Sequence, residues 1–177
     1  MRILIISDIH DHIWNLGALL EHRPASDQLV VCGDLCAPFV VGLLAEAYAG
    51  PIDIVFGNND GDLYCIAQQA ARYPHVTLHG ELLRADWDGL RIAANHYPDI
   101  ARGLADSGAY DLVCYGHNHR YAVHREGDTW LLNPGAVMGY DPGARADVPA
   151  TCLVYDTGAD QVEGYRIRLD GLVPLHD

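Results

Sequence analysis

Basic residues are scarce in this chain, which carries 11 arginines and no lysine against 24 aspartates and glutamates and has a formal net charge of -13 at pH 7. A protein that binds nucleic acid needs a basic face to neutralise phosphates. Eleven basic side chains could form a large patch only by leaving the other faces strongly acidic. We therefore expect no stable nucleic-acid binding, and a nuclease that acts on long polymers is disfavoured.

Long apolar segments are also absent. No apolar run approaches the roughly 18 residues that a membrane-spanning helix requires. The first residues, MRILIISDIHDH, lack the apolar region and the small-residue cleavage site of a signal peptide. Together these absences predict a cytoplasmic protein without membrane contact.

Cysteines are few, and their number, five, is odd. Without a secretory signal this indicates reduced thiols. Most of them lie in apolar surroundings and are expected to act as small buried hydrophobic residues. Cys32 and Cys36 flank Asp34, but a structural zinc site requires a second cysteine or histidine pair at matched spacing, which we do not find.

Apolar segments alternate in type along the first half of the chain. Their patterns predict strands at 2–7, 28–33 and 51–56 and helices at 13–22, 39–49 and 61–72. This alternation indicates parallel strands joined by helical crossovers. The second half is mostly short strands, with a hairpin turn at Asp88-Gly89, a helix at 98–107 and a mobile loop at 138–150. No linker or repeat is visible, so we predict one domain spanning residues 1–177.

Polar residues of ligand type follow five of the predicted strands. They are Asp8 and His10, Asp34, Asn58 with Asn59 and Asp60, His96, and His117 with His119. In open α/β sheets, sites form at the carboxyl ends of the strands. Asp8 and His10, like His117 and His119, are two residues apart, a spacing that places side chains on one side of an extended segment.

Without Asn59 and Asp60, this set contains two carboxylates, one amide oxygen and four imidazoles. These seven potential ligands are too many for one tetrahedral zinc ion. Such donors suit Mn²⁺, Fe, Co, Ni or Zn²⁺ in five- or six-coordinate sites. The number is natural if one carboxylate bridges two ions roughly 3.5–4 Å apart, an arrangement used for in-line displacement at phosphorus with a metal-bound hydroxide as nucleophile.

Each of these residues taken singly has a plainer interpretation. A lone aspartate after a strand, such as Asp34 or Asp60, is usually a helix N-cap. A lone histidine is more often structural than a ligand, and we expect that of the histidines outside the motifs: His12, His22, His75, His79, His124 and His176. The coincidence of suitable donors at five successive strand ends favours a metal site.

The order of these motifs resembles the calcineurin-like metallophosphoesterases, whose pattern is D-x-H, G-D, G-N-x-D/E, H and G-H-x-H. The chain has DIH at 8–10, GD at 33–34, GNND at 57–60, His96 in NHY, and GHNH at 116–119. Its length and composition resemble the small bacterial and archaeal phosphodiesterase branch. The resemblance implies an α/β (α+β) fold, a four-layer αββα sandwich of two mixed β-sheets flanked by helices.

The resemblance also implies the role of each ligand. Asp8, His10 and His119 would hold the first metal ion, and Asn58, His96 and His117 the second. Asp34 would bridge the two ions, and a bridging hydroxide would attack phosphorus. Manganese is the first candidate for both ions, with iron, zinc, nickel and cobalt as alternatives. Asp11 is either an orienting residue behind a ligand or a surface residue.

Two positions depart from the family pattern. Asn59 stands where many phosphatases of the superfamily have a histidine that stabilises the transition state or protonates the leaving group. Asparagine can hydrogen-bond a phosphoryl oxygen but cannot act as a general acid. Tyr97 stands where glycine is frequent, and it either narrows the pocket or packs. We expect Asn59, Asn118 and Tyr97 as substrate contacts.

The leading hypothesis is a dinuclear metal-dependent phosphoesterase that hydrolyses small phosphodiesters. A phosphomonoesterase, including a phosphoprotein phosphatase, would use the same site. A hypothesis from another class is a non-catalytic scaffold, since a retromer subunit of similar fold works mainly through its surface. Small members of the family often associate, so a homodimer is compatible with the resemblance.

Overall fold

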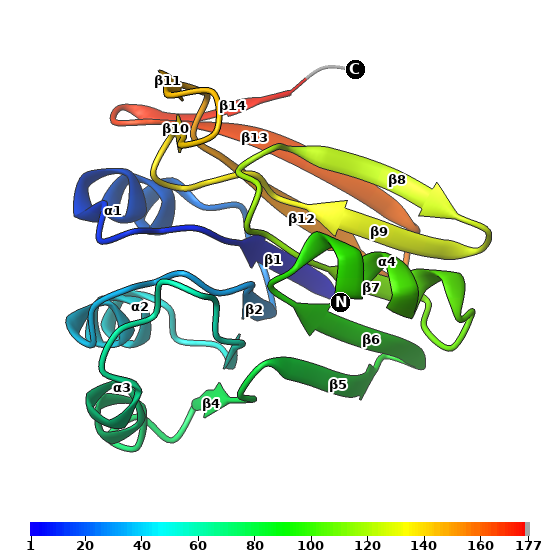
Figure 1. The fold of residues 1–177 in the computed structure, drawn as a ribbon, viewed down its shortest axis with the longest axis horizontal. Helices are drawn as coiled ribbons and strands as arrows, with labels where there is room; N and C mark the ends of the chain where they lie inside the picture. The colour runs from blue at the N-terminus through cyan, green and yellow to red at the C-terminus, as the bar shows by residue number, and fades with distance from the viewer. Residues whose placement is uncertain (176–177) are drawn as a thin grey trace.

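Two mixed β-sheets stand face to face at the centre of the molecule, as Figure 1 shows for the computed structural model. The structure describes residues 1–175. His176, expected as a structural histidine, therefore lies outside the described residues.

The first sheet has seven strands within the described residues, and parallel and antiparallel pairs occur on its two sides. The buried segments near the N-terminus form the parallel part, and the C-terminal strands add antiparallel pairs on the other side of β1. In spatial order the strands are β14 (Gly171–Pro174), β13 (Gln161–Arg168), β12 (Thr151–Asp156), β1 (Arg2–Ile6), β2 (Gln28–Val31), β3 (Ile52–Ile54) and β4 (Val76–Leu78).

The second sheet has five strands within the same part of the chain. Its central strands β6, β7 and β9 run parallel, and the edge strands β5 and β8 pair antiparallel with their neighbours. In spatial order they are β5 (Leu82–Trp87), β6 (Leu90–Asn95), β7 (Leu112–Cys114), β9 (Thr129–Asn133) and β8 (Ala122–Glu126). The hairpin predicted at Asp88-Gly89 joins β5 to β6 and is confirmed.

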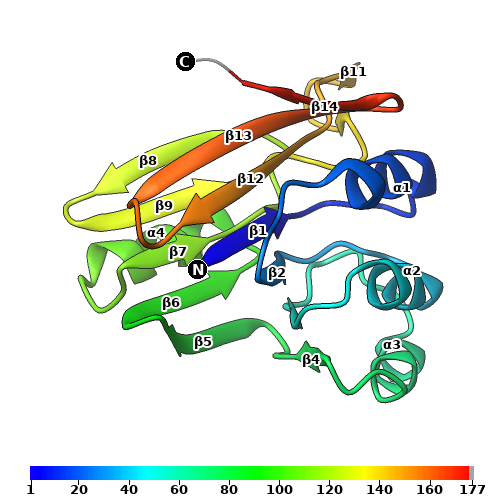
Figure 2. The same ribbon diagram turned by 180° about the vertical axis from the view of Figure 1, so that it is seen from behind.

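Helices cover the outer faces of both sheets, and Figures 1 and 2 show them on opposite sides of the molecule. The first three pack on the seven-stranded sheet and the fourth on the five-stranded sheet. They are α1 (Ile13–His22), α2 (Phe39–Ala47), α3 (Leu63–Ala70) and α4 (Pro98–Asp106). The order helix, sheet, sheet, helix confirms the predicted four-layer sandwich.

Strand β1 shows why a continuous apolar run suits this architecture. Its side chains alternate between the two faces of the sheet. Leu4 and Ile6 belong to the core beneath the helices, whereas Ile3 and Ile5 belong to the core between the sheets. Both faces of the strand are buried, so apolar residues do not alternate with polar ones in its sequence.

The predicted strands at 28–33 and 51–56 and the predicted helix at 39–49 are shorter in the structure. Two further differences have an identifiable physical cause. The third helix begins at Leu63 rather than at residue 61, because the Asp62 side chain accepts a hydrogen bond from the Cys65 amide and caps the helix there. The loop predicted at 138–150 contains a short hairpin of β10 (Tyr140–Asp141) and β11 (Ala146–Asp147). Two-residue strands leave no alternation in a sequence, so this hairpin was not predictable from pattern.

Every helix within residues 1–175 falls short of the length and apolar character that a transmembrane segment requires.

Candidate metal centre

The structure brings the seven predicted ligand side chains together at the carboxyl ends of the strands. Asp8 follows β1, Asp34 follows β2 and Asn58 follows β3 in the first sheet. His96 follows β6 and His117 follows β7 in the second sheet. The loops of two sheets thus meet over one site, which explains why the ligands are scattered over more than a hundred positions of the sequence.

The backbone of these loops is left-handed at most of the ligand positions. The φ angle is 54° at Asp8, 45° at His10, 55° at Asp34, 73° at His117 and 59° at His119. Non-glycine residues rarely adopt this conformation, and clusters of such strain occur at functional sites. The prediction of extended segments at the two i, i+2 pairs is therefore wrong, and tight left-handed turns direct these side chains instead.

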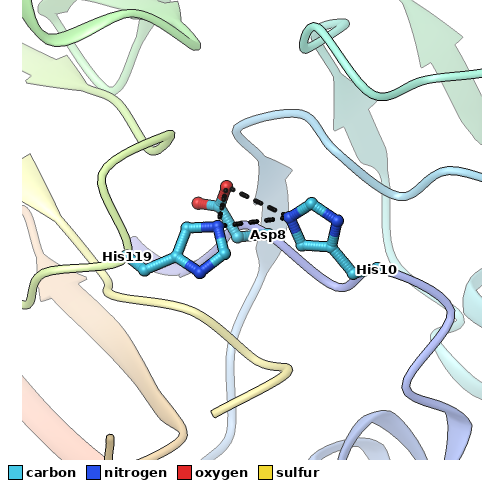
Figure 3. A group of neighbouring side chains, drawn as sticks. All are labelled: Asp8, His10 and His119. Carbon is cyan, nitrogen blue, oxygen red and sulfur yellow. Dashed lines mark hydrogen bonds and ion pairs between the residues drawn. The ribbon is translucent and has the colours of Figure 1, made fainter. Parts of the chain in front are cut away.

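Asp8, His10 and His119 form the first of two groups, and Figure 3 shows their side chains converging. His119 Nε2 lies 3.2 Å from Asp8 Oδ1 and 3.2 Å from His10 Nε2. His10 Nε2 lies 3.8 Å from Asp8 Oδ1. Two imidazole nitrogens and a carboxylate oxygen thus face one small volume, and the Asp8 and His119 side chains are buried.

Asn58, His96 and His117 form the second group. Asn58 Oδ1 lies 2.8 Å from His117 Nδ1 and 3.2 Å from His96 Nε2. Asp34 stands between the groups, because its Oδ2 is 3.5 Å from His10 Nε2 and 3.4 Å from His96 Nε2. One carboxylate oxygen therefore faces a histidine of each group, as a bridging ligand would.

In three of the histidines the ring nitrogen that points away from the site, Nδ1, has a partner that orients the ring. His96 Nδ1 lies 2.7 Å from the Cys32 carbonyl oxygen, and His119 Nδ1 contacts the Tyr140 carbonyl oxygen. His10 Nδ1 lies 3.4 Å from Cys36 Sγ. A backbone carbonyl accepts a hydrogen bond from the protonated Nδ1, which leaves the Nε2 lone pair directed into the site, the usual arrangement of metal-binding histidines.

The carboxylates and imidazoles shift each other's pKa values. Burial alone would raise the pKa of Asp8, but the facing imidazoles of His10 and His119 outweigh it and hold that pKa far below its ordinary value. Burial likewise opposes a lowered pKa at Asp34, which hydrogen bonds from His96 and Asn59 nevertheless produce. The pKa values of His96 and His119 are raised: burial lowers them, and contact with Asp34 and Asp8 respectively outweighs it.

The donor set fits divalent transition-metal ions. Two carboxylates that stay ionised, an amide oxygen and imidazoles with lone pairs turned inward are borderline ligands of the kind that Mn²⁺, Fe²⁺ and Zn²⁺ accept. The approach of His10 Nε2 to His119 Nε2 requires a shared proton or a cation to offset two facing lone pairs. The residues present are therefore those that a metal centre needs.

The predicted substrate contacts lie around the site in three different environments. Asn59 is turned toward Asp34, because its Nδ2 donates to Asp34 Oδ2 at 2.8 Å. Asn118 accepts hydrogen bonds at Oδ1 from the Arg120 amide and Asn133 Nδ2. Tyr97 packs against the rings of His96 and His117, with centroid distances of 5.3 Å to each.

Asp60 organises the loops, a role that the sequence analysis missed. Its carboxylate accepts backbone hydrogen bonds from Gly57 at 2.7 Å, Asp34 at 3.1 Å and Cys36 at 2.8 Å. It is not a helix N-cap, since Asp62 fills that position in α3. Its place in the GNND motif was the available signal.

Asp11 and Asn133 also hold loops in place. Asp11 Oδ1 accepts a hydrogen bond from the Ala37 amide, so it links two loops beside the site. The buried Asn133 donates from Nδ2 to the Gly116 carbonyl oxygen and to Asn118, and thereby supports the turn before His117.

Several histidines outside the motifs have other partners, as predicted. His12 caps α1 by accepting from the Asn15 amide. His75 contacts the Ala45 carbonyl oxygen, and His79 pairs with the buried Asp53. These three rings are engaged outside the groups that could hold a metal ion.

A cavity of about 530 Å³ opens directly over the two groups. Its volume lies in the range of small-molecule sites. The β10–β11 hairpin forms one wall, so the segment predicted as a loop does shape the pocket. The lining residues are His10, Asp34, Asn58, Asn59, His117, Asn118, His119, Arg120, Asp141, Pro142 and Gly143.

Comparison with known proteins places this arrangement in a family. The calcineurin-like phosphoesterase superfamily domain matches residues 1–160. Phosphodiesterase MJ0936 of Methanocaldococcus jannaschii is 29% identical over 147 residues, which cover 81% of this chain and 88% of that protein.

Solved structures share the fold at lower sequence identity. An archaeal phosphodiesterase superimposes with a TM-score of 0.82 at 24% identity, covering 99% of this chain and 100% of the other. Vacuolar protein sorting 29 from Cryptosporidium parvum superimposes with a TM-score of 0.71 at 17% identity, covering 98% and 95%. Because the family domain matches most of the length of this chain, the chain belongs to the calcineurin-like phosphoesterase superfamily.

Proposed function

We propose that this protein is a phosphodiesterase that hydrolyses small phosphodiesters with two divalent metal ions. The observation that carries the proposal is the pair of donor groups that share Asp34, one on each side of its Oδ2. A single structural ion would need only one such group. The cavity above both groups gives a small ester access to them.

In this proposal Asp8, His10 and His119 would hold one ion, Asn58, His96 and His117 would hold the other, and Asp34 would serve both. When bound, the ions supply Lewis acidity toward the phosphate oxygens and activate water as a nucleophile. The carbonyl groups of Cys32 and Tyr140 keep His96 and His119 in the tautomer that presents Nε2.

The side chains above the ions bind and orient the phosphate. Because Asn118 Oδ1 accepts two hydrogen bonds from the protein, its amide nitrogen is the end left to donate to a phosphoryl oxygen. Asn59 can make a second such contact once its amide leaves Asp34. Neither asparagine can protonate a leaving group, so the proposal favours esters with good leaving groups.

The proposal prefers phosphodiesters over monoesters because the curated relative with 29% identity is named a phosphodiesterase. A phosphomonoesterase, including a phosphoprotein phosphatase, would use the same residues. The assay below distinguishes this alternative from a phosphodiesterase.

Side-by-side hydrolysis of bis(p-nitrophenyl) phosphate and p-nitrophenyl phosphate tests the proposal. We expect the Mn²⁺-loaded protein to hydrolyse the diester with the higher kcat/KM and to lose this activity on chelation. His119→Ala should be inactive, whereas His124→Ala, an exposed histidine on β8, should match the unaltered protein. Absence of diester hydrolysis with Mn²⁺, Ni²⁺, Co²⁺ and Zn²⁺ would contradict the proposal.

A scaffold protein is a second candidate, favoured by one surface feature. An apolar groove of about 590 Å³ lies between α1 and α2, where the Trp14 side chain is exposed. Exposed apolar side chains gathered along one groove are a feature of interaction sites. A scaffold has no need of the seven donors, so metal-dependent turnover in the assay above would decide against it.

A further inference from the structure

The charge of the cavity over the metal centre is uneven. Among its lining residues, Arg120 is the one side chain with a permanent positive charge, and Asp34 and Asp141 are acidic. The lining histidines must be neutral to bind metal ions. Because the whole protein has a formal net charge of -13, a cation at the mouth of this cavity is conspicuous.

A backbone hydrogen bond and one long side-chain contact place Arg120 in the cavity lining. Its backbone amide donates to Asn118 Oδ1 at 3.0 Å, which fixes the turn after His119. Its Nε lies 3.7 Å from Asp141 Oδ2 in the β10–β11 hairpin. Asp141 is itself held, because its Oδ1 accepts hydrogen bonds from the amides of Gly143 and Ala144.

These contacts leave most of the guanidinium available. Arginine has five N–H donors, and the 3.7 Å approach to Asp141 is longer than a hydrogen bond. No other side-chain partner of Arg120 occurs among residues 1–175. The side chain is 72% exposed, whereas that of Asp141 is 10% exposed, so the fork of N–H groups faces solvent at the cavity mouth.

We propose that Arg120 forms an anion subsite that binds a second phosphate group of the substrate. The inference rests on the proposed function, because the first phosphate is anchored at the ions held by His119 and its neighbours. Arg120 follows His119 directly in the chain, and the cavity of about 530 Å³ is much larger than one phosphate group. A guanidinium matches phosphate with two parallel hydrogen bonds.

The subsite assigns a substrate class to the enzyme: small phosphodiesters that carry a further phosphate on one alcohol component. Such substrates are more anionic than a simple diester, and the acidic surface would repel them without a cation at the entrance. Arg120 then acts on binding, while the residues beneath it serve the reacting phosphate.

Binding of short alkyl phosphates to the Mn²⁺-loaded protein tests the subsite without turnover. Isothermal titration would compare the α,ω-bisphosphates of ethane, propane and butane with ethyl, propyl and butyl phosphate. We expect at least one bisphosphate to bind about 10-fold more tightly than its monophosphate partner. Arg120→Gln should remove this preference, and Arg84→Gln, an equal charge change on β5, should retain it.

The possible results separate the subsite from the proposed catalytic activity. If no bisphosphate is preferred, or if the preference is equal in Arg120→Gln, the second phosphate does not bind Arg120 and the inference is wrong. The Mn²⁺ content of Arg120→Gln should equal that of Arg84→Gln, because neither side chain belongs to a donor group. Loss of the preference with full Mn²⁺ content supports the inference, and loss of the preference together with the Mn²⁺ contradicts it. An unaltered protein that does not hydrolyse bis(p-nitrophenyl) phosphate contradicts only the proposed function.

Discussion

The divergence of His117 and His119 is the clearest feature at the scale of single residues. Their side chains start from the same short loop, yet His117 Nδ1 faces Asn58 and His119 Nε2 faces Asp8. Both residues have positive φ angles, so the chain turns tightly at each of them. In the proposed site this places one histidine in each donor group and leaves the amide nitrogen of Asn118, between them, to contact the phosphate.

A single substitution tests this division. His117→Ala should reduce bound Mn²⁺ from about two ions to about one, because the second group loses one of its imidazoles. The affinity for the affected ion should fall at least about 100-fold. Metal content after dialysis and isothermal titration would measure the loss.

His124→Ala is the matched control, since its exposed ring lies on β8 and outside both donor groups. It should bind as much Mn²⁺ as the unaltered protein. Full occupancy in His117→Ala would refute the role given to His117.

At the scale of elements, the loops after β2 and β3 fit together through a glycine. A Cβ atom placed on Gly57 would lie 2.2 Å from Asp34 Oδ1 and 2.7 Å from the Asp34 amide nitrogen. Such distances are far inside van der Waals contact, so only glycine allows the loop after β3 to approach Asp34. The position of the Asp34 carboxylate therefore depends on Gly57, a residue that has no donor side chain of its own.

Gly57→Ala should displace Asp34 and destabilise the protein. Overpacking of this kind costs about 1–3 kcal/mol of unfolding free energy, and Mn²⁺ affinity should fall together with it. Urea denaturation and metal titration would measure the two effects.

Gly103→Ala provides the contrast within α4, where a Cβ would meet nothing within 4 Å. There alanine should raise stability by about 0.5–1 kcal/mol through its higher helix propensity. Unchanged metal affinity in Gly57→Ala would show that the packing against Asp34 does not set the site.

At the scale of the whole molecule, protons and metal ions compete for the same site. In the metal-free protein the pKa values of His96 and His119 are raised from 6.5 by Asp34 and Asp8 against the opposing effect of burial. A raised histidine pKa adds stability that is fully present below the unfolded value and is lost as the pH rises through the folded value. Metal binding requires the opposite, neutral state.

The stabilisation that Mn²⁺ provides should therefore increase with pH. We expect the difference in Tm between the Mn²⁺-loaded and metal-free protein to grow from pH 6 to pH 8, because fewer protons have to be displaced at the higher pH. Differential scanning fluorimetry at fixed Mn²⁺ concentration would measure it. A difference that is constant or decreases with pH would show that these histidines do not bind the metal.

Much of the fold could be predicted because its determinants are local. The continuous apolar run at 2–7 indicates a strand buried on both faces, and the structure places it at the centre of the larger sheet. Short elements were less accessible: the β10–β11 hairpin has two residues per strand, too few for any periodicity. The Asp141 side chain accepts hydrogen bonds from two backbone amides in the turn, and these contacts cannot be predicted from a hydrophobic pattern.

The candidate site likewise has features that could be predicted from the sequence and features that could not. Residue types and their order along the chain were enough to propose seven candidate ligands, and the structure brings these side chains together. The left-handed turns that direct them were not predictable, because aspartate and histidine adopt such φ angles only where the surrounding contacts impose them. Asp60 and Arg120 were missed for a related reason, as their roles come from partners distant in sequence.

The sequence by itself determined the type of chemistry that this protein could support: its donor atoms, their order and an acidic surface unsuited to nucleic acid. Only the tertiary structure decided which donors share a site, because that depends on two sheets packing face to face and bringing five strand ends together. It also decided that one arginine stands at the cavity mouth with most of its donors free. Contacts between residues more than a hundred positions apart exist only after the chain has folded.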